Sequence, residues 1–374
     1  MTENKTSAEN FVYQNLHKTS DGILMTFNTS AYDLSIDFIK GLCILFVVWT
    51  HCFGGKILNY SFFDLWGYPA VPVFLLIQVF HAYKKGVDNV KKVSIKKLWD
   101  RIIMPFAIWM VAILVIKLAF SSHSALEIIK SGIKAGGYGP GSYYPYIYVE
   151  FALLLPLLVP MFQKIKNKLT LGVVFIVVSI VLEIICNLIN MPVGLYRLLC
   201  FRYIFIVYLG WLLVEKCLII NKLTIVLSIL SAMTILYVRF IGCQFSHFPE
   251  SIRNILIPIF NRDFTPFVYP AWQQAHWFCY FWDCYLYLFF ILLLYKFVSK
   301  YDKISSLIQK MGKYSYEIFL FQMFYFTFSP KVDNVIKMVF DNKILAKGSY
   351  IICSTVVCVG VVLLWKKIRE KVAH

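Results

Sequence analysis

The sequence has few charged residues, and acidic residues are the scarcest of them. Of its 374 residues only 15% are charged, with 20 Asp and Glu against 37 Lys and Arg. Hydrophobic residues make up 59% of the chain, and the mean hydropathy is +0.68. A soluble domain of this size needs more polar side chains to cover its surface. The composition therefore excludes a soluble globule or a disordered chain, and it predicts an integral membrane protein.

Cysteine pairs and metal-ligating clusters are also missing. The ten cysteines are scattered, none stands in a CxxC pair, and most fall inside apolar runs. We interpret them as small buried hydrophobic residues, and we expect neither a disulfide framework nor a bound metal. An internal repeat, which many transporters carry, is not visible either.

Ten apolar runs are long enough to cross a bilayer, which requires roughly 20 residues of helix. The fold class predicted is all-α, a polytopic membrane helix bundle. A transmembrane domain over 34–366 would follow a polar arm over 1–33 and precede a basic tail over 367–374. The runs lie near 34–53, 65–83, 102–120, 144–163, 169–188, 198–215, 221–241, 276–298, 314–330 and 347–365.

The positions of Lys and Arg indicate how the bundle is oriented. If ten spans follow a cytoplasmic N-terminus, 23 of the 37 basic residues fall in cytoplasmic segments and 10 fall on the opposite side. Cytoplasmic loops of membrane proteins are typically enriched in Lys and Arg. We therefore expect both termini in the cytoplasm. The same placement, in short clusters between apolar runs, argues against a nucleic-acid partner.

The first span carries ionisable residues, which are energetically costly in lipid and therefore need an explanation. Asp37 and Lys40 are three residues apart and can pair on one helix face. His51 follows Lys40 by eleven residues, so both project the same way, about 16 Å apart along the axis. Histidine is the usual proton-transfer group near neutral pH. The pattern fits a catalytic stripe, and it also fits an ion pair at the membrane boundary with an interfacial histidine.

Other charged residues have two interpretations as well. Lys97 and Arg101, at the start of the third span, either bind an anionic substrate or only set the topology. Glu150 and Arg202 can pair across the bundle, which would support the fold and take no part in chemistry.

Two long segments on the predicted outer side have compositions that suit a glycan. Residues 121–143 contain the flexible stretch KAGGYGPGS, and residues 242–275 are rich in aromatic and amide side chains. Trp272 and the nearby Trp277 fit a sugar-binding surface, and they also fit an aromatic belt at the level of the lipid headgroups.

The first span resembles that of acyltransferase family 3. In that family the first helix carries an acidic residue, an Arg or Lys three positions on, and a His eleven positions beyond, as Asp37, Lys40 and His51 do here. The chain departs from the family at Gln322, where a His is frequent, and at Glu150, where a Gln is common. Five later segments resemble the family in order: GYPAVPVFLLIQVF, KKLWDRIIMPFAIW, SYYPYIYVEFALLLPLL, FRYIFIVYLGWLL and GKYSYEIFLFQMFYF.

The resemblance implies a membrane O-acyltransferase. Such an enzyme moves an acyl group, by default acetyl, from cytoplasmic acyl-CoA to a hydroxyl of an extracytoplasmic polysaccharide or glycolipid. His51 would act as general base or first accept the acyl group itself. Lys40, Lys97 and Arg101 would bind the acyl donor, and Asp37 would hold Lys40 in place.

We therefore expect a multi-pass protein of the cell membrane, in the cytoplasmic membrane of a bacterium. Acetyl-CoA or another acyl-CoA would be a co-substrate, with no bound cofactor. The expected partners are acyl-CoA, a cell-surface glycan or lipid-linked sugar, and membrane lipids. The rival interpretation is a polysaccharide transporter or flippase, or a membrane component of an export complex, in which the same charges line a path without acyl transfer.

Overall fold

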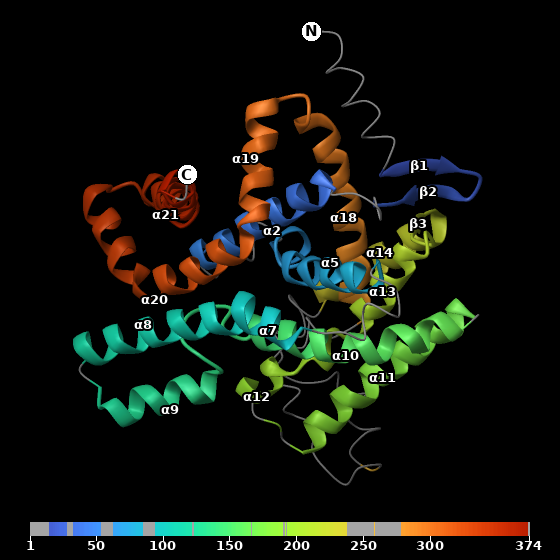
Figure 1. The fold of residues 1–374 in the computed structure, drawn as a ribbon, viewed down its shortest axis with the longest axis horizontal. Helices are drawn as coiled ribbons and strands as arrows, with labels where there is room; N and C mark the ends of the chain where they lie inside the picture. The colour runs from blue at the N-terminus through green and yellow to red at the C-terminus, as the bar shows by residue number, and fades with distance from the viewer. Residues whose placement is uncertain are drawn as a thin grey trace.

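The chain forms a bundle of α-helices with one small sheet, as the computed structural model shows (Figure 1). The second long outer segment, 242–275 with Trp272, lies outside the described residues, position 258 apart, and so does Trp277. Residues 85–93 of the basic segment before the third span also lie outside them. The structure describes residues 15–27, 33–53, 63–84, 94–237 without 122, 166, 190 and 192, then 258 and 278–372.

A helix lies within each of the ten apolar runs. Among the described residues, four helical stretches are long and apolar enough to cross a membrane, and five shorter apolar helices accompany them. This is the architecture of an α-helical membrane protein, while ten crossings and two cytoplasmic termini stay predictions. The helices are α2 (Leu34–Cys52), α5 (Ala70–Lys84), α8 (Met104–Phe120), α10 (Tyr144–Lys164), α11 (Lys168–Leu188), α13 (Ile204–Val214), α14 (Lys222–Tyr237), α18 (Phe278–Val298), α20 (Ser315–Val339) and α21 (Lys343–Val372).

Shorter helices connect and cover these elements. Two of them, α9 (Ala125–Ala135) and α19 (Asp302–Lys313), are amphipathic, so each has one apolar face to pack against the bundle. The others are α4 (Phe63–Trp66), α7 (Ile95–Leu98), a π-helical turn η1 (Trp99–Ile103), α12 (Val193–Leu198) and a 3₁₀ turn η2 (Cys200–Tyr203).

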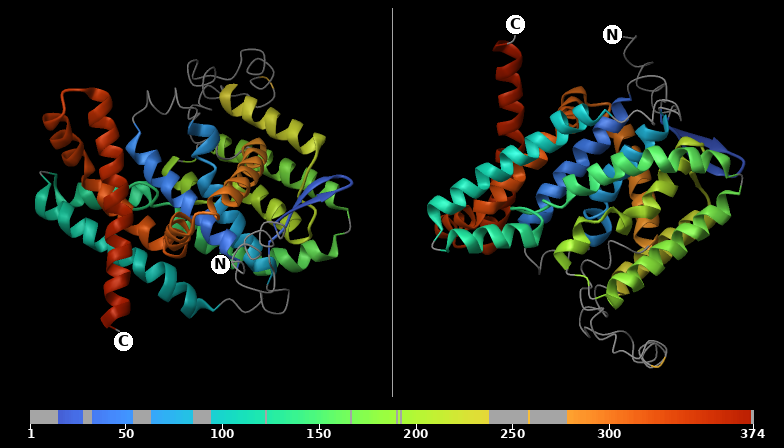
Figure 2. Two further views of the ribbon diagram at one scale, coloured as in Figure 1. Left: turned by 90° about the horizontal axis from the view of Figure 1, so that it is seen from above. Right: turned by 60° about the horizontal axis from the view of Figure 1, so that its bottom comes forward.

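Helix α2 runs through the middle of the bundle (Figure 2). It begins where the Asp33 carboxylate accepts a hydrogen bond from the backbone N–H of Ser35 at 2.9 Å, which caps the first turn. It then packs against α5, α18, α19, α20 and α21. Its approach to α19 is close, because a side chain at Gly41 would collide with the backbone carbonyl of Ile308. The surrounding helices therefore fix the position of its last turn, which carries His51.

The sequence analysis does not predict the sheet. Strands β1 (Leu16–Thr19) and β2 (Gly22–Met25) form an antiparallel hairpin, and β2 also pairs with β3 (Ile219–Ile220). An arm without regular structure is expected over residues 1–33, whereas 16–25 form this hairpin. A two-stranded hairpin alone is marginal in water, and here the third strand, far away in the sequence, completes the sheet.

Candidate active site

His51 stands on the last turn of α2 and lines a cavity of about 630 Å³. Its ring is half-buried and lies 5.4 Å from the ring of Phe326 on α20, centroid to centroid. Among the described residues, no side chain forms a hydrogen bond with its ring nitrogens. The imidazole therefore faces a cavity, and its ring nitrogens are available to a ligand.

The wall of the cavity opposite α2 is the segment that follows α9. Its residues 137–144 line the cavity together with Ser131 and Ala135 of α9. The segment turns sharply at Gly139, whose φ of +86° favours glycine, and a side chain there would meet the carbonyl oxygen of Met323 on α20. The glycine-rich stretch thus lets the chain pack tightly on α20 while it leaves space in front of His51.

Hydroxyl groups provide most of the polarity of this cavity. Thr50, Tyr68, Ser142 and Tyr143 all line it. Lys117 is its one cationic lining residue among those that the structure describes, and its Nζ lies 5.2 Å from the centroid of a tyrosine ring of the same wall. Neutral hydroxyls both donate and accept hydrogen bonds, so the surface matches a ligand that itself carries many hydroxyls.

A smaller cavity of about 40 Å³ continues from the first one toward the start of α2. The two cavities share Val47, Val71, Tyr144 and Phe319, and the smaller one reaches Ile44. Positions 51, 47 and 44 follow one another at intervals of four and three residues, so they lie along one face of α2. Position 40 is the next on this face, one helical turn below Ile44.

Lys40 pairs with Asp37, as their spacing predicts. The distance between Lys40 Nζ and Asp37 Oδ1 is 2.6 Å, and the side chains are 24% and 5% exposed. The nearly buried carboxylate therefore has a cation beside it, which offsets the cost of its burial. The pair lies below the smaller cavity and is separated from His51 by nearly three turns of α2.

Lys97 and Arg101 are both exposed, in the segment that leads into α8. Lys97 belongs to α7 and Arg101 to the π-helical turn η1. The next residue, Ile102, accepts a hydrogen bond from the Tyr316 hydroxyl at 2.8 Å. Tyr316 also lines the smaller cavity. The basic start of α8 is thus linked to the cavities through one tyrosine, although neither cation reaches His51.

Glu150 has a structural role in the described part of the chain. Its Oε2 accepts a hydrogen bond from the backbone N–H of Cys200 at 2.5 Å, at the beginning of η2. The side chain of Arg202 lies outside the described residues, so its pairing with Glu150 stays a prediction.

Gln322 contributes to the site in a way that sequence reasoning missed. It is fully buried on α20, and its Nε2 donates a hydrogen bond to the carbonyl oxygen of Pro140 at 3.3 Å. Pro140 belongs to the glycine-rich wall of the His51 cavity. The signal was an amide inside an apolar span, since such a group needs a buried partner. Its Oε1 has no hydrogen-bond partner among the described groups.

Three observations bear on the identity of the chain. The described residues include no group of three or more His, Cys, Asp or Glu side chains that could hold a metal ion. No curated protein and no solved structure matches the chain. A family model described as an acyltransferase domain matches residues 33–365, from the cap of α2 into α21. The match contains His51 and every residue that lines the two cavities, and with it the chain belongs to acyltransferase family 3.

Proposed function

We propose that the protein is an O-acyltransferase of the cell membrane. It moves an acetyl group from cytoplasmic acetyl-CoA to a hydroxyl of an extracytoplasmic polysaccharide or glycolipid. The observation that carries the proposal is the position of His51, which lines a cavity that continues, through shared residues, along α2 as far as Ile44.

His51 serves as the general base. A ring nitrogen takes the proton of the acceptor hydroxyl while the hydroxyl oxygen forms a bond to the thioester carbonyl carbon. The carbon–sulfur bond then breaks, and the imidazolium returns the proton to the sulfur of CoA. The products are an ester and free CoA, so the histidine ends the cycle as it began.

The acyl donor approaches from the side on which α2 and α8 begin. Lys97 and Arg101 are exposed there, and CoA carries phosphates that guanidinium and ammonium groups bind well. The thin pantetheine arm follows the face of α2 past Lys40 toward Ile44 and the smaller cavity. Asp37 holds Lys40 in this position and does not touch the substrate.

The acceptor occupies the larger cavity. Its volume of about 630 Å³ is within the range of small-molecule sites, roughly 300–1,000 Å³. Its hydroxyl groups match those of a sugar, and the tyrosine rings of the wall offer flat faces for stacking. The glycine-rich wall at 137–144 places backbone groups close to the ligand as well.

The decisive experiment replaces the imidazole. Membranes that contain full-length His51→Ala protein, given labelled acetyl-CoA, should transfer label to the glycan fraction about 10²- to 10⁴-fold more slowly than wild type, the usual contribution of a positioned base. His123→Ala is the matched control, because His123 is exposed on the segment before α9, and it should keep full activity. Full activity of a well-inserted His51→Ala protein would refute the proposal. So would glycan that crosses the membrane without gaining label.

A further inference from the structure

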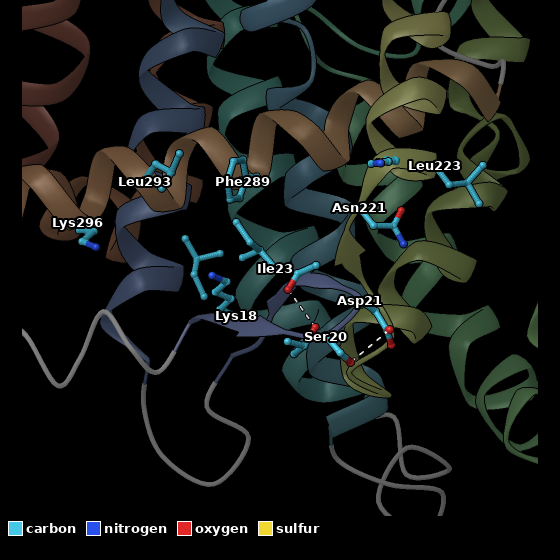
Figure 3. Close-up of a pocket in the computed structure, with 13 residues that line it drawn as sticks. Lys18, Ser20, Asp21, Ile23, Asn221, Leu223, Phe289, Leu293 and Lys296 are labelled. Atoms are coloured by element: carbon cyan, nitrogen blue, oxygen red, sulfur yellow. Dashed lines mark hydrogen bonds between the residues drawn. The ribbon is translucent and has the colours of Figure 1, made fainter.

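A second and larger cavity, of about 830 Å³, lies beside the N-terminal hairpin and shares no lining residue with the His51 cavity. Its walls come from the hairpin, the start of α14 and the last turns of α18 (Figure 3). On α18, the ring of Tyr295 lies 4.7 Å from that of Phe38 in the first turns of α2, centroid to centroid. The hairpin cavity therefore lies at the level where α2 begins, while His51 stands on its last turn.

The polar part of the hairpin cavity is cationic. Lys18 of the hairpin, Lys222 at the start of α14 and Lys296 at the end of α18 line it together. The only acidic lining residue described is Asp21, whose carboxylate accepts a hydrogen bond from the Ser20 hydroxyl at 3.3 Å. Among the described residues, none of the three lysines has an ion-pair partner. Three cations against one carboxylate favour an anionic ligand.

The remaining wall of the hairpin cavity is apolar and continues onto the outside of the bundle. Leu223 of α14 and Phe289 and Leu293 of α18 line the cavity next to the lysines. Leu223 is 66% exposed, and further along the same two helices the side chains of Val226 and Phe290 are exposed as well. A ligand that fits must carry a charged group at one end and an apolar chain at the other.

We propose that the hairpin cavity binds an anionic membrane phospholipid. The headgroup phosphate lies among Lys18, Lys222 and Lys296, and an acyl chain lies along α14 and α18. The hydroxyls of Thr19 and Ser20 line the same space, where they donate to the carbonyl oxygen of Gly22 and to the Asp21 carboxylate, so the three lysines are left to bind the phosphate. Lysines at the membrane boundary keep their charge in water while their stems cover apolar surface, which is how basic pockets between helices hold lipid headgroups.

The ligand class follows from the combination of the two walls. A soluble phosphate compound would use the lysines but would leave the apolar wall of Leu223, Phe289 and Leu293 uncovered. A neutral lipid would cover that wall but would leave the three ammonium groups without an anion. This inference needs α14 and α18 to lie in the membrane, and it does not depend on acyl transfer.

The test uses purified full-length protein in detergent and native mass spectrometry with two probes of equal chain length, dioleoyl phosphatidylglycerol and dioleoyl phosphatidylcholine. The triple variant K18Q/K222Q/K296Q should bind phosphatidylglycerol about tenfold more weakly, since each lysine contributes to the attraction. The triple variant K300Q/K303Q/K367Q is the matched control. It removes the same charge at exposed lysines that do not line the cavity, and its affinity should stay within about twofold of wild type.

Further measurements distinguish the binding of a lipid from the binding of a soluble anion and from misfolding of the variants. Leu223→Gln, at an exposed position, should weaken the binding of phosphatidylglycerol severalfold and leave the binding of pyrophosphate unchanged. Thermal unfolding of each variant in detergent checks that the bundle remains folded. Equal loss in both triple variants, or an unchanged phosphatidylglycerol affinity in Leu223→Gln, would overturn the assignment of a phospholipid.

Discussion

The two large cavities lie at opposite ends of α2, and they differ in the kind of polarity that they offer. The cavity at His51 is lined mainly by hydroxyls and by glycine-rich backbone, with a single lysine among its described lining residues. The hairpin cavity has three lysines and a wall of leucine and phenylalanine. Hydroxyls suit a neutral ligand with many hydroxyls of its own, whereas clustered ammonium groups suit a phosphate.

The two cavities also differ in whether backbone conformation or side-chain charge determines their character. The His51 cavity is enclosed by segments that turn back on the bundle, so its shape depends on backbone conformation at the turn after α9. The hairpin cavity forms where three segments expected on one side of the membrane meet, so its character depends on side-chain charge. Mutations of backbone and mutations of charge should therefore affect the two cavities differently.

The largest expected effect is that a variant in either cavity impairs the function of that cavity and spares the function of the other. His51→Ala should slow acetyl transfer about 10²- to 10⁴-fold and leave phosphatidylglycerol affinity unchanged, because the histidine lies nearly five helical turns away from the start of α2. K18Q/K222Q/K296Q should weaken the binding of phosphatidylglycerol. It should keep the catalytic rate constant at saturating acetyl-CoA within about threefold, because mutations at distant sites usually act independently. Both readouts are measured on the same purified proteins. Loss of both activities in both variants would show that the two cavities form one site.

The helices at the ten apolar runs and the ion pair on α2 could be predicted from the sequence. The apolar runs are long and uniform, so a helix at each follows from length and hydropathy alone. The ion pair of Asp37 with Lys40 follows from a local spacing of three residues. Such features need only neighbours along one helix, which the sequence displays directly.

The cavity walls could not be predicted, because they depend on contacts between distant segments. The two-residue strand β3 has no sequence signal of its own. It forms because it pairs with β2 at Ile23 and Leu24. Likewise the turn at Gly139 becomes a wall only where it meets α20. In the sequence Gln322 is only a departure from a family pattern, and its hydrogen bond to Pro140 depends on a contact between distant segments.

A smaller effect is expected from Gly139→Ala, which changes only the wall of the His51 cavity. A φ of +86° costs an alanine roughly 1–2 kcal/mol, and its Cβ would stand 2.6 Å from the carbonyl oxygen of Met323. The turn must shift, so KM for the acceptor should rise about tenfold while phosphatidylglycerol affinity stays the same. Gly348→Ala on α21 is the control, because a Cβ there meets no neighbour within 4 Å. An unchanged KM for Gly139→Ala would show that this wall does not contact the acceptor.

The smallest expected effect is at the first turn of α9, a helix that lines the His51 cavity and not the hairpin cavity. Glu127 accepts a hydrogen bond from the backbone N–H of Ser124 at 3.1 Å, and this bond holds the pKa of the Glu127 carboxyl below its ordinary value. A lowered pKa in the folded state stabilises this turn above the unfolded pKa of about 4.3, and the contribution is lost as the pH falls through the folded value. Glu127→Gln should thus exchange amide hydrogens of residues 124–128 faster than wild type near pH 7.

The pH dependence of that difference is the sharper measurement. Wild type and Glu127→Gln are compared at each pH, so that the intrinsic exchange rates cancel. The difference should shrink as the pH falls below the unfolded pKa of about 4.3 and vanish once the pH has passed through the lowered folded pKa of Glu127, because both proteins then carry a neutral side chain at position 127. Exchange in the hairpin over 16–25 should not respond to the substitution at any pH. A difference over 124–128 that did not decrease with falling pH would mean that the hydrogen bond, and not the charge of Glu127, stabilises the start of α9, and acidification would then leave this part of the His51 cavity intact.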